Sequence, residues 1–295
     1  MTLTQDRLIA AAPTQRPTSG RARTLGGWWG LAVCVSSLFC VVFAVLLSGL
    51  QEHSSQKSLY SSFREQLAEA TAPVSGPISP GRPVALLRIP RLSKALVVVE
   101  GTAGRDLRAG PGHRRDTVLP GQRGVSVVYG RSLTYGAPFA DLRQLRAEDT
   151  LTALTGQGTF TYRVDRVRRP GDPLPPPLAL GGSRLVLASV VSGGGALGWG
   201  SRHVFYVDAT LEGKAADPNP LLSATLGAEG LGATDTSGLT LLVLWLQLLV
   251  VATWTLAWAG TRWGVKQAWS VGVPVLLALL WAAVNAASTL LPNTV

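Results

Sequence analysis

The stretch VSVVYGR, residues 125–131, ends a run of strand-forming residues at Gly130 and then presents Arg131. A strand that stops at a glycine and carries a polar side chain is a typical framework for a functional position. A guanidinium stays protonated near neutral pH, so Arg131 can bind an anion but cannot act as a general base. The sequence therefore predicts a charged binding position here, with no proton transfer by Arg131.

Few residues of this chain could serve as nucleophiles. Its two cysteines, Cys34 and Cys40, both lie in an apolar segment near the N-terminus. Ser189 and Ser192 end a strand-like run, but a serine hydroxyl becomes nucleophilic only beside a base. His203 could be that base for Ser192. The plainer interpretation is two loop serines and a surface histidine.

Three apolar segments, 26–50, 239–260 and 268–291, are long enough to span a bilayer. Four arginines precede the first segment in a tail, 1–25, and two cations lie in a short hinge, 261–267. The positive-inside rule then predicts a plasma-membrane protein with a cytoplasmic N-terminus and an extracytoplasmic middle section. A cleaved signal peptide is the alternative for the first segment, but no small-x-small site follows it, which favours an uncleaved anchor.

The formal net charge of +10 comes mainly from scattered arginines, with no lysine-rich arm or zinc-finger spacing. This pattern argues against nucleic acid as a partner. The glycine-rich stretch SGGGALGWG lacks the Lys-Ser/Thr of a phosphate loop, and nothing in the chain predicts a cofactor or a metal.

The middle section divides into a helix and linker, 51–80, a strand-rich domain, 81–213, and a second linker, 214–238. Leu59, Phe63 and Leu67 recur at helical spacing within 53–70. Short strand-like runs separated by Gly/Pro turns then predict a small barrel or sandwich. These runs are 84–89, 96–100, 125–129, 150–154, 159–167, 184–191 and 203–211.

Four motifs in this domain occur together and in order: IPRL, GPGH, LPGQ and YGAPF. In combination, over residues 89–211, they resemble the sortase family, and most closely its actinobacterial housekeeping-type, class E-like members. The resemblance implies an eight-stranded β-barrel, here combined with three transmembrane helices, one N-terminal and two C-terminal. It also implies a membrane-anchored cysteine transpeptidase that attaches proteins to the cell wall or a pilus.

The family's chemistry needs a cysteine nucleophile, a histidine that handles the proton, and an arginine that stabilises the substrate or oxyanion. By this resemblance, Arg131 stands in the place of the histidine and Val190 in the place of the cysteine. Arg202 is the candidate for the retained arginine, with Arg184 as its competitor. The chain is thus identified as a catalytically degenerate member of the family.

The resemblance aims Arg131 into the cleft beside Val190. A buried charge needs a partner, and Asp141, Asp208 or the carboxylate of a bound peptide could supply one. The alternative is that Arg131 points to solvent at the cleft rim.

A binding surface is predicted from five residues: Tyr129, Arg131, Val190, Trp199 and Arg202. His113, in GPGH, corresponds to a structural or surface position. The proline-rich run GDPLPPPLALGG is expected to form a stiff loop, which borders the peptide groove in sortases.

Gln247 and Asn285 interrupt the two C-terminal apolar segments. Amides in lipid seek partners, so they predict helix–helix contacts, within one bundle or with another membrane protein.

The predicted function is that of a non-catalytic scaffold in a membrane complex, which binds an envelope protein, an active sortase or a sorting-signal peptide. The alternative is an active transpeptidase or hydrolase with unusual site residues. A transporter subunit is disfavoured, because the three segments contain no ionisable residue.

Overall fold

The computed structural model describes residues 39, 48–74, 77–192, 202–218, 239–263, 265–288 and 290. At a few of them, Ser192 and Arg202 included, it describes the backbone alone. The chain forms two compact units, Met1–Val41 and Val42–Val295. The predicted tail, most of the N-terminal apolar segment, Trp199 and most of the second linker lie outside the described residues.

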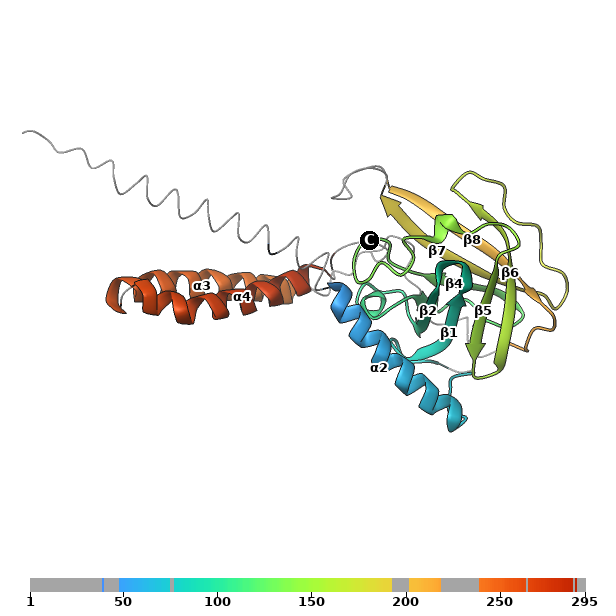
Figure 1. Cartoon of the computed structure of the whole chain (residues 1–295), viewed down its shortest axis with the longest axis horizontal. Coiled ribbons are helices and arrows are strands. Elements are labelled where there is room, and N and C mark those ends of the chain that lie inside the picture. Colours follow the sequence, from blue (N-terminus) through green and yellow to red (C-terminus); the bar gives the residue numbers. More distant parts are fainter. Residues whose placement is uncertain are drawn as a thin grey trace, which may run out of the picture. The chain divides into compact units, whose positions relative to one another are not determined.

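Eight strands close into a barrel in the order β1-β2-β3-β4-β7-β8-β6-β5 (Figure 1). The strands are β1 Pro83–Ile89, β2 Lys94–Glu100, β3 Gly112–His113, β4 Gly124–Tyr129, β5 Thr150–Thr155, β6 Gly158–Arg168, β7 Ser183–Ser192 and β8 Arg202–Glu212. The expectation of a mainly β, eight-stranded barrel is confirmed. Only β3 was not foreseen, because a two-residue strand is too short to show any periodicity.

Apolar residues alternate along the first part of β6, and these apolar residues are the ones that fill the barrel. Phe160, Tyr162 and Val164 point inward and are buried with the main core. The alternation fails after Val164 because the register with β8 shifts between Val164 and Arg166. Such a bulge inserts an extra residue into the ladder and turns the following side chains over.

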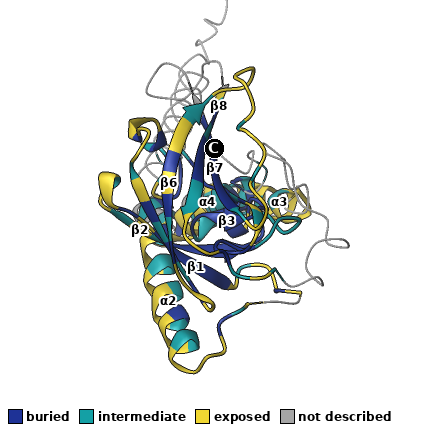
Figure 2. Ribbon diagram, turned by 90° about the vertical axis from the view of Figure 1, so that its right-hand side faces the viewer, coloured by how far each residue is buried: buried dark blue, intermediate teal, exposed yellow. Residues whose placement is uncertain are grey.

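Helix α2, Ser48–Ala68, packs on the outside of the barrel. Phe63 is buried against Leu86 and Val97, with Leu59 and Leu67 beside it. The predicted apolar face is therefore confirmed, and Figure 2 shows α2 exposed along its other side. The described part of this helix begins at Ser48, before residue 53, where the sequence pattern predicts its start.

Helices α3, Leu239–Trp263, and α4, Val265–Ala287, lie side by side (Figure 1). Each contains a segment long and apolar enough to cross a membrane, Leu239–Ala259 and Ser270–Ala287. At Gly272 the helices approach so closely that an added Cβ would lie 2.2 Å from Leu256 Cδ1. Small residues allow membrane helices such a contact. Helix α3 continues to Trp263, which lies within the predicted hinge 261–267.

Of the two amides in the C-terminal apolar segments, only Asn285 has a side-chain contact among the described residues, and that contact is not between α3 and α4. Gln247 is exposed on α3. Asn285 Oδ1 accepts a hydrogen bond from Arg108 Nη1 at 3.0 Å, and Arg108 belongs to the 3-10 helix η3, Asp106–Arg108, of the barrel domain. Asn285 lies in the last turn of α4, where that helix meets the barrel, so its amide is satisfied there.

Candidate functional site

Strands β4 and β7 run parallel and end at the same edge of the barrel. The ladder pairs Tyr129 with Ala188, and the Gly130 amide continues it with a 3.1 Å bond to the Ala188 carbonyl. Arg131, two residues after the end of β4, and Val190, near the end of β7, therefore lie side by side. The Ser132 hydroxyl bonds to the Val190 carbonyl. Neighbouring ends of parallel strands commonly carry functional side chains.

Arg131 is fully buried, at 0% exposure. Its Nη2 donates to the Gly104 carbonyl at 2.8 Å, and its Nη1 donates to Thr134 Oγ1 at 3.1 Å. The guanidinium carbon lies 4.9 Å from the centroid of the Tyr135 ring, a distance typical of a cation–π contact. Carbonyl, hydroxyl and aromatic groups thus surround the cation.

Burial lowers the pKa of Arg131 to about 10, an effect that Tyr135 opposes and nearby Arg108 reinforces. Even so, the guanidinium is almost entirely protonated at pH 7. Arg131 therefore holds a permanent charge in a place from which water is excluded.

The carboxylates considered for Arg131 bind other residues. Asp141 pairs with Lys94 at 3.1 Å, and the fully buried Asp208 pairs with Arg168 at 2.6 Å. The alternative position at a solvated rim is also wrong, because Arg131 is buried. The sequence missed the aromatic partner, although Tyr135 was already part of the YGAPF motif.

Residues 130–141, which we call the site loop, fold back over the strand end. The Phe139 amide donates to the Arg131 carbonyl at 3.0 Å, and Lys94 Nζ donates to the Pro138 carbonyl at 2.9 Å. At Gly130 an added Cβ would lie 2.4 Å from the Phe139 ring. Glycine is therefore required at this position for the loop to close.

Two helices also contact the site loop. The Tyr135 amide donates to Ser48 Oγ, at the start of α2, at 3.1 Å. The Tyr135 hydroxyl lies 2.6 Å from Ser288 Oγ, directly after α4, and both groups are buried. Tyr135 thus joins the Arg131 guanidinium to the end of the helical hairpin.

Glu52 of α2 lies against the same loop, since its carboxylate approaches the Cα of Gly136. Burial raises the pKa of Glu52 from 4.5 to about 7, and Lys94 acts in the opposite direction. No sequence pattern marked this residue, because one glutamate on a helix is usually solvated.

The β7–β8 ladder does not place the histidine candidate opposite either serine candidate. The buried Ser189 hydroxyl donates to the Gly130 carbonyl at 2.8 Å. His203 is exposed on β8, where the ladder places it opposite Val191 and not opposite Ser192. His113 is structural: its buried ring bonds to Glu100 Oε2 at 2.8 Å and to the Val118 carbonyl at 2.9 Å.

The other predicted binding residues are distributed as follows. Tyr129 is buried on the outer side of β4 against Leu107 and Ala188, and burial raises its pKa. The Arg202 backbone pairs with Ser192, two positions beyond Val190. Arg184 lies at the start of β7. At about 3.3 Å per residue along a strand, it is roughly 20 Å from Val190. Its side chain donates a hydrogen bond to the Pro176 carbonyl. It therefore holds the proline-rich loop, far from the site loop.

Among the described residues, no group of three or more His, Cys, Asp or Glu side chains could hold a metal ion. The carboxylates nearest to this region form ion pairs or lie in an apolar setting, so a Lewis acid has no ligand set in the described part of the site. The chemistry available here is charge, hydrogen bonding and apolar contact.

Comparisons with known proteins point to one family. The sortase domain model matches residues 87–173. Over 121 residues the chain is 28% identical to sortase D of Bacillus subtilis, covering 41% of this chain and 53% of that protein. The chain thus spans about half the length of sortase D.

Solved sortase structures are also similar to the chain. The chain is 30% identical to sortase E from Streptomyces avermitilis, covering 48% of this chain and 93% of that one, with a TM-score of 0.37. A Clostridium perfringens sortase D transpeptidase is 21% identical, covering 54% and 99%, with a TM-score of 0.45. The chain belongs to the sortase family.

Glu52→Gln should make the stability of the protein less dependent on pH. The folded-state pKa is raised, so the stability from this carboxyl is complete below pH 4.5 and is lost as the pH rises through 7. Between pH 5 and 8 the free energy of unfolding of the wild type should therefore fall by about 1–3 kcal/mol more than that of the variant. Denaturant unfolding of the full chain in detergent, monitored by fluorescence, measures this difference. The exposed Glu65→Gln on the same helix is the control, and an equal pH slope in Glu52→Gln and wild type would contradict the assignment.

The effects of Tyr135→Phe and Ser288→Ala on the stability of the site loop should not be additive. Each removes one partner of the same bond, worth about 1 kcal/mol, so the double variant should resemble either single one. The hydrogen-exchange rates of the backbone amides of residues 130–141, measured in the full chain, give the effect of each single variant and of the double variant. Ser270→Ala, whose hydroxyl bonds within its own helix, should leave exchange unchanged. Fully additive effects would show that the two hydroxyls do not interact.

Proposed function

We propose that this chain is a membrane-anchored, non-catalytic sortase-family protein that serves as a peptide- or protein-binding scaffold at the cell envelope. The observation that carries the proposal is the side chain at position 190. Valine has no nucleophilic atom, and the only two cysteines of the chain are Cys34 and Cys40, in the N-terminal apolar segment. A thiol at the end of β7 is what the family reaction requires.

The charge at Arg131 supports the same conclusion. A histidine at this position could accept and return a proton, whereas a buried guanidinium with a pKa near 10 stays charged. Two of its donors are used by Gly104 and Thr134. Arg131 therefore acts as an internal support of the site loop, and a ligand would contact the surface that the loop forms.

Ser189, which directly precedes Val190 in β7, is an alternative nucleophile, and its setting argues against that role. Its hydroxyl is buried and donates to the Gly130 carbonyl. Activation would need a base in contact with that hydroxyl, whereas His113 is held by Glu100 and Val118. The role of Ser189 is to tie β7 to the end of β4.

The membrane topology belongs to the same proposal. The tail arginines and the cations between α3 and α4 favour a cytoplasmic side for both, which leaves the barrel domain outside the plasma membrane. A scaffold in this position could bind an envelope protein, an active sortase or a sorting-signal peptide. The bond between Arg108 and Asn285 would fix the barrel near the membrane surface.

A cleavage assay on the full chain in nanodiscs tests the proposal. The probe is a quenched fluorogenic peptide with an LPxTG-like sorting signal, offered with and without hydroxylamine as acceptor. We expect no cleavage product from the wild type, while the same peptide with a single fluorophore binds saturably by anisotropy. Wild-type cleavage that is abolished by Ser189→Ala would overturn the proposal and establish the alternative of an active enzyme.

A further inference from the structure

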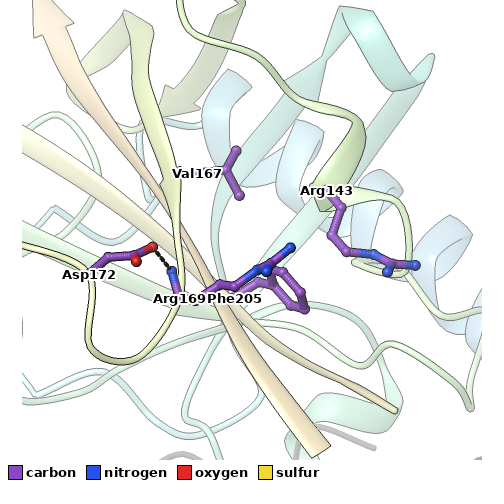
Figure 3. A pocket seen from close by; sticks show the side chains of 5 residues that line it. All are labelled: Arg143, Val167, Arg169, Asp172 and Phe205. Carbon is purple, nitrogen blue, oxygen red and sulfur yellow. Dashed lines mark hydrogen bonds between the residues drawn. The ribbon is translucent and has the colours of Figure 1, made fainter. Parts of the chain in front are cut away.

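A separate hollow of about 370 Å³ lies where β6, β8 and the 3-10 helix η4, Leu142–Gln144, come together. Figure 3 shows the five side chains that line it: Arg143, Val167, Arg169, Asp172 and Phe205. Phe205 of β8 is buried, and Val167 of β6 is half-buried. The two arginines and Asp172 are exposed. The hollow therefore has an apolar wall and a charged opening.

Two cations share one aromatic ring at this place. The guanidinium carbons of Arg143 and Arg169 lie 5.7 and 5.5 Å from the centroid of Phe205. Arg143 comes from η4 and Arg169 from the loop after β6, so separate parts of the chain bring them together. Like charges around one ring repel each other, and an anion bound between them would remove that repulsion.

The described part of the barrel offers neither arginine an ion-pair partner. The neighbouring Arg168 differs, because its Nε lies 2.6 Å from Asp208 Oδ2 and its charge is compensated on the opposite side of β6. Asp172 is the only carboxylate in the lining, and its Oδ2 accepts a 2.6 Å bond from the Arg169 backbone amide. This bond orients the loop and leaves two positive charges facing one negative charge.

We propose that this hollow binds the carboxylate of a peptide, with an adjoining apolar side chain resting on Phe205 and Val167. Guanidinium groups bind carboxylates through paired, charge-assisted hydrogen bonds. The volume exceeds what a small inorganic ion needs, and it lies in the range of pockets that take organic groups. The apolar wall supplies the remaining contact area, which a free ion would not use.

The site is distinct from the position of Val190. Successive residues of a strand face opposite sides, and Val204, not Phe205, pairs with Val190 across the β7–β8 ladder. The hollow therefore lies on the other face of this strand pair. It goes beyond the proposed function, since it neither requires nor excludes a reaction at position 190.

Fluorescence anisotropy on the full chain in nanodiscs of neutral lipid tests the proposal. The probe is Gly-Gly-Gly-Leu-Phe with a neutral fluorophore on its N-terminus and a free C-terminal carboxylate. The same peptide with a C-terminal amide is compared with it. Arg143→Gln and Arg169→Gln remove one charge each, and the exposed Arg146→Gln on the same segment is the matched control.

We expect the carboxylate peptide to bind saturably and the amide to bind at least tenfold more weakly. Each of the two hollow variants should weaken binding about tenfold, the value of one charge-assisted hydrogen bond, while Arg146→Gln should bind as the wild type does. Equal binding of acid and amide, or an equal loss in Arg146→Gln, would overturn the site. Displacement by inorganic phosphate as effective as by the unlabelled peptide would overturn the peptide assignment. These outcomes do not depend on the cleavage assay.

Discussion

The arrangement of the site depends on how one buried cation is accommodated. Arg131 leaves the end of β4 toward the barrel domain and is fully buried there, where an uncompensated charge would cost several kcal/mol. The Gly104 carbonyl, the Thr134 hydroxyl and the Tyr135 ring offset that cost. Two of these three groups come from the site loop, so the charge and the loop conformation stabilise each other.

The loop in turn connects the barrel to the helices. Tyr135 contacts Ser48 at the start of α2 and Ser288 after α4, and Asn285 of α4 bonds to Arg108. In a sortase with a cysteine and a histidine, this region would have to admit a substrate. The family resemblance puts a valine, Val190, and a charge with internal contacts, Arg131, at the corresponding positions. These internal contacts are the reason why we propose a scaffold.

Sequence patterns predicted the barrel because its inward positions alternate in strands such as β6, and motif order gave the family. The neighbouring positions of Arg131 and Val190 also followed from that resemblance, and the parallel pairing of β4 and β7 explains them. The partners of Arg131 could not be predicted, because a carbonyl from residue 104 and a ring from residue 135 meet it only through tertiary packing. For the same reason, Glu52 gave no signal in the sequence.

The burial of Arg131 can be measured directly by its reaction with phenylglyoxal in the folded full chain, followed by peptide mass spectrometry. Exposed Arg143 and Arg146 serve as internal references. If the guanidinium is enclosed by Gly104, Thr134 and Tyr135, Arg131 should remain unmodified while both references react. Modification of Arg131 at the rate of the references would contradict the buried support and would make it a surface residue open to ligands.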